Sequence, residues 1–319
     1  MTTFRSLTRV GAGVAALAAV AATTNAVSAR SSYPTVRHVP TGISVNTEYA
    51  AVAPDAAVIT LTLTDKTVKG LPKVLAPGWH TFVLKDSTKD GRDVDFIKVK
   101  ATAKSYGVKQ FKADIAKANS DNGATAAQGV SDVIKHAQAE GGIAAPKYYA
   151  GTHRKLMVNL TAGRTYLLDN TSDGNGPENV SLCKVSGAAT KVKAPKATGT
   201  IATYEYGFRT VHLQSGTHLV RFTSTGAEAH IIFAAKVPQG TTTEDLQKAL
   251  SDPNAQGFPP GWTPWLTVNP MTHAGSFVAP VTFAPGSYAL ICFMPELKAG
   301  PNQGAPHFTE GMSTVITVS

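Results

Sequence analysis

The sequence predicts a mainly β protein made of two tandem Greek-key β-sandwiches, each with a short helical insertion. Three observations lead to this fold class. Segments that alternate apolar and polar residues recur, the chain has 28 Gly and 19 Pro to separate them by turns, and the motifs of the first half return in the second. At 319 residues, the chain is long enough for two domains with cores of their own.

The first 29 residues have the pattern of a signal peptide. Arg5 and Arg9 precede an apolar stretch over residues 10–22, which is too short to span a bilayer, and small residues suit cleavage near Ala29. Residues 30–55 are rich in Ser, Pro and Thr and show no periodicity, so we expect a mobile leader. The sequence therefore predicts an exported protein without a transmembrane segment, which is secreted, periplasmic or associated with the cell envelope.

The charge of the chain limits the partners that we expect. The formal net charge is +9, and it becomes +7 after signal-peptide cleavage because that segment holds two Arg and no acid. This surplus favours peripheral association with anionic surfaces. The Lys residues are scattered with little aromatic interleaving, so we expect no binding to nucleic acid.

Residues 56–187 are predicted to form the first sandwich. Strands are expected over six segments, the second of which begins with a turn: 58–64, 75–84, 93–99, 154–160, 164–168 and 179–185. Apolar residues spaced by three and four between positions 105 and 118 predict an amphipathic helix, and residues 130–137 are a second candidate. Residues 188–200, rich in Ala, Lys, Pro and Thr, are predicted to be a linker.

Residues 201–319 repeat this order of turns, strands and a helix, and are predicted to form the second sandwich. The turn at 213–218 matches the turn at 75–80, and both place a His at the sixth position, which predicts a structural role for that His. Residues 242–250 predict a helix with Thr241 or Thr242 as its N-cap and acidic residues in its first turn.

Four potential metal ligands occur in the second sandwich. An apolar strand after Gly286 brings Cys292 to its far end, His307 and Met312 follow, and His230 lies on an earlier strand. Thiolate, imidazole and thioether are soft or borderline donors. Two His and one Cys with a weak axial Met form a blue-copper electron-transfer site.

This arrangement resembles the cupredoxin family, which includes plastocyanin, azurin and pseudoazurin. The shared features are the Gly-x-Tyr-x-x-x-Cys strand end at 286–292, the Pro-His-x4-Met spacing at 306–312 and the earlier His230. The resemblance covers roughly residues 198–319. It implies one type 1 copper ion per chain, bound by His230, Cys292 and His307 with Met312 as the axial ligand. It also implies one-electron transfer with an unidentified redox protein or small-molecule partner.

The first sandwich has other residue types at the repeated positions. Asp95 occupies the place of His230, and Asp169 occupies the place of Cys292. We therefore expect residues 56–187 to form a degenerate cupredoxin-like domain without metal ligands. Such a domain would serve as a partner-binding surface or as a packing platform.

Two alternatives to a copper site stay open. In an exported protein, Cys183 and Cys292 can form a disulfide, which would exclude copper. The repeat nevertheless places these cysteines in different domains. The second alternative is a metal-free secreted binding or structural module that keeps only the scaffold, and the long segment between Cys292 and His307 favours it.

The residues beside Cys292 predict a carrier and not an enzyme. The family's oxidases and nitrite reductases have His beside the Cys, leading to a second copper centre, whereas Ile291 and Phe293 flank Cys292. The sequence contains no His-x-His pair of the kind that a trinuclear copper cluster needs. It also contains no Gly-x-Ser-x-Gly, His-Glu-x-x-His or phosphate-binding Gly-Lys-Ser/Thr motif.

Overall fold

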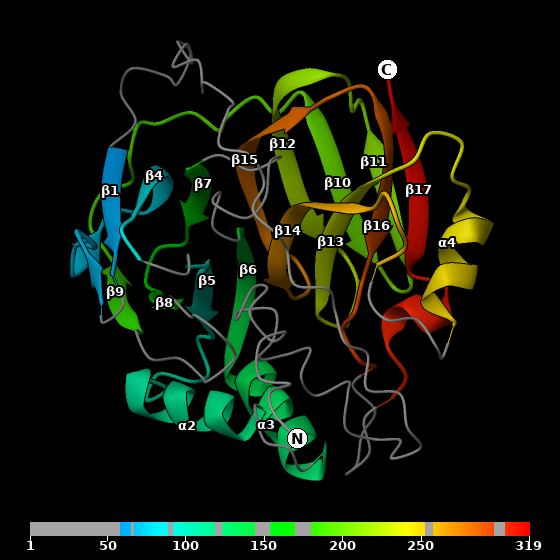
Figure 1. Ribbon diagram of the computed structural model, residues 1–319. Coiled ribbons are helices and arrows are strands. Elements are labelled where there is room, and N and C mark those ends of the chain that lie inside the picture. The colour runs from blue at the N-terminus through cyan, green and yellow to red at the C-terminus, as the bar shows by residue number, and fades with distance from the viewer. Residues whose placement is uncertain are drawn as a thin grey trace.

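The computed structural model describes residues 58–64, 67–88, 92–118, 123–143, 154–169, 180–252, 258–296 and 304–319. The predicted signal peptide and the predicted leader lie outside these residues. The described residues form a mainly β structure with two mixed sheets and three α-helices, which confirms the predicted fold class (Figure 1). None of these helices combines the length and the apolar character that crossing a membrane requires.

The first sheet contains eight strands, four from each half of the chain. In spatial order they are β11 (Gly207–Val211), β10 (Gly199–Tyr204), β12 (Gly216–Ser224), β15 (Ser276–Phe283), β7 (Lys155–Leu160), β4 (Gly78–Asp86), β1 (Val58–Leu63) and β2 (Val68–Lys69). The halves meet where β15 pairs antiparallel with β7, with Val278 opposite Met157.

The second sheet contains nine strands and crosses the same junction. Its spatial order is β17 (Ser313–Val318), β16 (Gly286–Ile291), β13 (His230–Val237), β14 (Thr263–Met271), β6 (Ala137–Ile143), β5 (Val94–Val99), β8 (Thr165–Asp169), β9 (Ser181–Val185) and β3 (Val74–Leu75). Here the halves meet through β14 and β6, with Val268 opposite Ile143.

The strand order is the same in both halves when it is followed outward from the junction. One half of the first sheet runs β7-β4-β1-β2, and the other runs β15-β12-β10-β11. In the second sheet the corresponding orders are β6-β5-β8-β9 and β14-β13-β16-β17, and the first half adds β3 beyond β9. Each half also contains one parallel pair in the first sheet, β1 with β4 and β10 with β12. This agreement is consistent with the repeated motifs, and a duplication of the chain stays a prediction.

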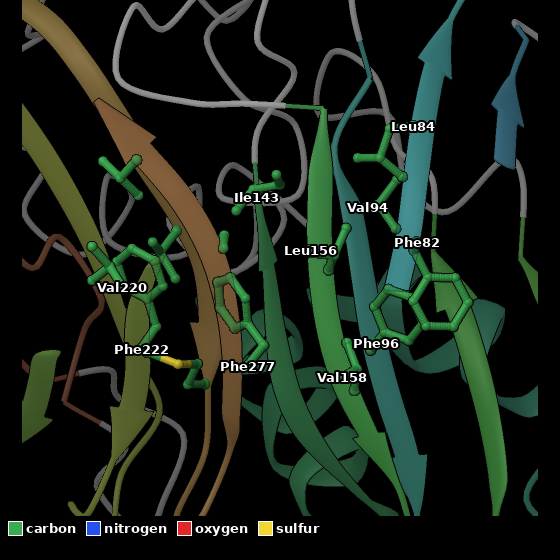
Figure 2. Packing of buried hydrophobic residues seen from close by; sticks show 14 of the residues in the cluster. Phe82, Leu84, Val94, Phe96, Ile143, Leu156, Val158, Val220, Phe222 and Phe277 are labelled. Carbon is green, nitrogen blue, oxygen red and sulfur yellow. The ribbon is translucent and has the colours of Figure 1, made fainter. Parts of the chain in front are cut away.

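A single buried apolar cluster lies between the two sheets and extends through both halves. Figure 2 shows Phe82 and Phe96 of the first half, and Phe222 and Phe277 of the second, within this cluster. Ring centroids are 4.6 Å apart in the first pair and 5.0 Å apart in the second. Burial of one such side chain contributes about 1.5–3 kcal/mol. The two halves therefore share one core. The sequence had predicted two sandwiches, each with its own core, connected by a linker.

The helical insertion of the first half consists of α2 (Val108–Ala118) and α3 (Gly123–His136). It packs an apolar cluster against the second sheet, with Phe111 and Ile115 meeting Ile97 and Leu167. Both helices were expected, although α3 is longer than the segment 130–137. Figure 1 shows the pair at one end of the strands, and α3 leads directly into β6.

The insertion of the second half is α4 (Thr243–Leu250), and its start confirms the predicted cap. The Thr242 hydroxyl accepts a hydrogen bond from the Asp245 backbone N–H at 3.1 Å. In return the Asp245 carboxylate accepts one from the Thr242 N–H at 2.9 Å, which completes a capping box. The buried Leu246 fixes this helix against the second sheet.

The two histidines for which a structural role was expected, His80 and His218, are the third residues of β4 and β12. Nε2 of His80 lies 2.7 Å from the carbonyl oxygen of Ala76. Nε2 of His218 lies 2.8 Å from the carbonyl oxygen of Ser215. Each imidazole therefore closes the turn that precedes its own strand, which supports the structural role.

Candidate metal centre

Three of the four predicted ligands converge at one end of the second half. His230 is the first residue of β13, Cys292 directly follows β16, and His307 begins a short 3-10 helix, η2 (His307–Glu310). All three side chains are fully buried. The Nδ1 atoms of the two histidines are 3.1 Å apart, and Sγ of Cys292 is 3.5 Å from Nδ1 of His307. Their donor atoms all lie within 4.8 Å of one another.

This group of donors fits a single metal ion. Metal–nitrogen and metal–sulfur bonds of about 2.0 and 2.3 Å are usual for such ligands. Both the 3.1 Å and the 3.5 Å separation are shorter than two such bonds end to end, so one ion can reach both atoms of each pair. The buried thioether of Met312, in the same cluster as Cys292, favours copper among such metals. Within the described residues, this is the one group of three or more His, Cys, Asp or Glu donors that can hold a metal.

Met312, the predicted axial ligand, is fully buried in the apolar cluster that contains Cys292. The two residues are also joined through the backbone, because the Cys292 N–H donates to the Met312 carbonyl at 3.1 Å. Met294 is a second buried thioether in the same cluster, which the sequence analysis missed. Its position two residues after Cys292 is the signal that points to it.

The long segment between Cys292 and His307 is closed at its base by backbone pairing. The Glu296 N–H donates to the Ala305 carbonyl at 3.0 Å, and the Gly304 N–H donates to the Glu296 carbonyl at 2.9 Å. The His307 N–H donates to the Met294 carbonyl at 2.7 Å. The described residues on either side of 297–303 are therefore paired with each other. The extra length of this segment does not separate His307 from Cys292.

A tight turn after His307 brings Met312 back to the site. The His307 carbonyl accepts the Met312 N–H at 2.9 Å, and the Cys292 carbonyl accepts the Phe308 N–H at 3.0 Å. Gly311 has a φ of +99°, the left-handed conformation in which Gly commonly ends a helix. The x4 spacing between His307 and Met312 is therefore the length of one 3-10 turn with its cap.

A β-bulge positions His230. Strand β14 contains Pro264 and Pro270, and the pairing of β13 with β14 shifts between His230 and Ile232 and again after Ala234. Proline has no N–H to donate and is tolerated in a sheet at such irregularities. The shift beside His230 therefore accommodates Pro270.

The outer edge of His307 has two neighbours that the sequence analysis missed. Nε2 of His307 lies 2.9 Å from Oε2 of Glu228. The ring of Tyr206 meets the imidazole edge to face at 5.4 Å between centroids, and its hydroxyl donates to Glu296 at 3.1 Å. An acid two residues before His230 is a signal that could have identified Glu228. Nothing in the sequence indicates Tyr206, which lies in the turn between β10 and β11 with a φ of +56°.

Burial shifts the pKa of two of the three donors. It raises the pKa of the Cys292 thiol to about 12. Burial, followed by the charge of the nearby His307, lowers the pKa of His230 to about 4. In the metal-free protein at neutral pH, His230 is therefore a neutral imidazole and Cys292 a thiol. A bound metal ion reverses the preference of the thiol, because coordinated thiols are deprotonated.

The repeated positions of the first half contain charged residues. Asp95 of β5 lies opposite Asp169 of β8 in the sheet. Arg92, Asp93 and Asp95 are all buried. Carboxylates are hard donors, unlike the thiol and imidazoles of the second half. That the first domain is free of metal stays a prediction.

The disulfide alternative is wrong, because both cysteines are free thiols. Cys183 lies on β9 in the main core, and its Sγ is 3.5 Å from the carbonyl oxygen of Lys184. Burial raises the pKa of the Cys183 thiol to about 11. Nδ1 of another histidine, His273, lies 3.2 Å from the carbonyl oxygens of Thr225 and Gly226, and His273 does not join the donors.

Comparison with known proteins found no matching family model and no matching curated protein. Among solved structures, similar chains include auracyanin from Roseiflexus castenholzii, at 22% identity and a TM-score of 0.24, covering 38% of this chain and 94% of auracyanin. A copper nitrite reductase from Nitrosomonas europaea matches at 11% identity and a TM-score of 0.22, covering 83% of this chain and 94% of the reductase.

Identities and TM-scores this low carry no argument about activity. The cupredoxin resemblance rests instead on the site. The group formed by His230, Cys292 and His307 fits a type 1 copper site, which confirms the resemblance drawn from the sequence.

Proposed function

We propose that the protein binds one copper ion through His230, Cys292 and His307, with Met312 as a weaker fourth ligand, and transfers single electrons. The observation that carries this proposal is the convergence of two imidazoles and a thiol in a fully buried group. When bound, copper supplies a one-electron couple between its cupric and cuprous states. One electron enters from a reduced donor and leaves to an oxidised acceptor, and no atom is transferred.

The chain's own residues hold the donors in place and keep water away. Backbone hydrogen bonds connect Cys292 to Met312 and Phe308, and His307 to Met294 and Met312. The apolar cluster around the thiol includes Ala229 and Ile231 in addition to the two methionines. Because these contacts exist without the metal, we expect little rearrangement when the charge of the site changes.

The surroundings of Cys292 support a carrier over an enzyme. Ile291 is buried in an apolar cluster on one side of the thiol. The ring of Phe293 packs on the other side, 5.6 Å from both Phe233 and Phe308 between centroids. Neither side chain has an atom that can bind a second metal. We expect the copper-loaded protein to exchange electrons with small redox mediators and to show no turnover with nitrite, or with phenols in air. Sustained turnover that depends on Cys292 would contradict this.

For the first half, which we propose to be a metal-free domain over 56–187, the structure favours a role as packing platform. Ile134 on α3 packs against the cluster that contains Cys292 and Met312. A helix of the first half therefore supports the candidate centre in the second. We propose export as well, on the basis of the sequence pattern at 1–29, and peripheral binding to anionic surfaces on the basis of net charge.

The test is a copper titration of purified metal-free protein. We expect an intense blue thiolate-to-copper absorption that saturates at one equivalent, bleaches with a reductant and returns with an oxidant. Cys183→Ser is the matched control, because it removes the other buried thiol and should keep the band. Absence of both the band and tight copper binding in the wild type would overturn the proposal and favour the metal-free scaffold.

A further inference from the structure

A carboxylate lies against the imidazole of His307 on the side away from the other donors. Oε2 of Glu228 is 2.9 Å from Nε2 of His307, and Nδ1 of the same ring is 3.5 Å from Sγ of Cys292. His307 is fully buried, whereas the Glu228 side chain is 21% exposed. The imidazole therefore separates a carboxylate at the edge of the protein from the buried donor group.

This contact determines which nitrogen of His307 can bind a metal. A carboxylate beside Nε2 favours a proton on that nitrogen, and the lone pair then lies on Nδ1. Nδ1 is the atom that faces His230 and Cys292. Such a hydrogen bond also orients the ring and raises the basicity of the metal-binding nitrogen.

The chain fixes the loop that presents Glu228. The Glu205 carboxylate accepts hydrogen bonds from the Ala227 N–H and, at 3.1 Å, from the Glu228 N–H. At the start of this loop, a Cβ at Gly226 would collide with Nε2 of His230, so the backbone lies directly on that ring. The position of Glu228 is therefore defined by the hairpin turn at Glu205 and by His230.

The two imidazoles consequently have different surroundings. Nε2 of His307 has a carboxylate partner, while Nε2 of His230 is buried and has no hydrogen-bond partner among the described residues. The Glu228 carboxylate thus lies in direct contact with a ligand, and its negative charge acts on the donor group through His307. Because a cupric ion carries one more positive charge than a cuprous ion, a nearby carboxylate stabilises the cupric state more.

We infer that Glu228 is a positioning residue that holds His307 with Nδ1 toward the donors and lowers the reduction potential of the centre. This inference rests on the copper site proposed above. It gives a role to a residue that touches a ligand and does not itself belong to the donor group.

The variant that tests this role is Glu228→Gln. Its amide oxygen can still accept the hydrogen bond from Nε2, but the negative charge is lost. We expect the ratio of cupric to cuprous affinity to fall about tenfold, within the range of about 10–100-fold found for ligand-supporting residues. For one electron, a tenfold change corresponds to a rise in potential of about 59 mV.

Two further variants serve as controls. Glu228→Asp keeps the charge and should restore most of the wild-type potential. Glu296→Gln removes a nearby carboxylate that accepts from Tyr206, so it should shift the potential much less. Circular dichroism and melting of each metal-free variant show whether it is folded.

The potential is measured by redox titration of the blue band, and a second readout comes from the metal-free wild type. Nitrogen NMR of the His307 ring should show its proton on Nε2, and a proton on Nδ1 would overturn the inference even if Glu228→Gln fails to fold. If the wild type binds no copper, the proposed function and this inference both fail. If it binds copper but Glu228→Gln shifts the potential no more than Glu296→Gln, this inference alone is wrong.

Discussion

Replacement of Cys292 by Ser should abolish the blue band and leave the fold intact. The side chain is fully buried among Ala229, Ile231, Met294 and Met312, and its Sγ lies 3.5 Å from Nδ1 of His307. A buried hydroxyl without a partner costs about 1–3 kcal/mol by protein mutational data. A hydrogen bond from Ser to His307 contributes about 0.5–1.5 kcal/mol in the opposite direction. We therefore expect the metal-free variant to lose about 0.5–1.5 kcal/mol of unfolding free energy, out of the usual total of about 5–15 kcal/mol.

Two measurements on Cys292→Ser separate the role of the thiol from its packing. Urea unfolding of the metal-free protein gives the stability change, and a copper titration followed by absorption gives the loss of colour. Cys183→Ser should lose a similar amount of stability, because that thiol is also buried, and should retain the band. A blue band that survives in Cys292→Ser would refute the assignment of the thiolate.

Two predictions concern the metal-free protein. His230 has a pKa of about 4 when folded and about 6.5 when unfolded, so the unfolded chain binds the proton first as pH falls. The free energy of unfolding should therefore fall by up to about 3 kcal/mol as the pH is lowered from about 6.5 to 4. Urea unfolding at several pH values measures this, and a loss in His230→Gln as large as in the wild type would contradict the prediction. Titration of thiols without reductant should find no rapidly reacting thiol in the native protein, because both cysteines are buried, and two thiols after denaturation. Fewer than two thiols after denaturation would show that Cys183 or Cys292 is oxidised.

The sequence predicted most strongly the elements that have a local signal. The alternating run at the start of the first half became β1, and the cap at Thr242 with Asp245 became the capping box of α4. Two strands at the junction were missed. β6 has the sequence Ala-Gln-Ala-Glu-Gly-Gly-Ile, which lacks the β-branched alternation of a strand, and β14 contains two prolines. Burial and sheet pairing override these weak local preferences.

In the candidate centre, too, the sequence predicted the residues that have a local signal and missed those whose contacts depend on distant segments. His307 and Met312 were predictable because one turn determines their spacing, and Cys292 because it ends an apolar strand. Glu228 and Tyr206 were missed because their contacts depend on two loops folding over His307. The shared core of the two halves could not be predicted either, since it depends on pairing between strands far apart in the sequence.

The central claim is that His230, Cys292 and His307 bind copper together. X-ray absorption at the copper edge of protein loaded with one equivalent tests it most directly, because the method identifies the atoms bonded to the metal. The account predicts two imidazole nitrogens at about 2.0 Å and one sulfur at about 2.3 Å, with the sulfur absent in Cys292→Ser. A first shell of nitrogen and oxygen alone, or one that is unchanged in Cys292→Ser, would contradict it.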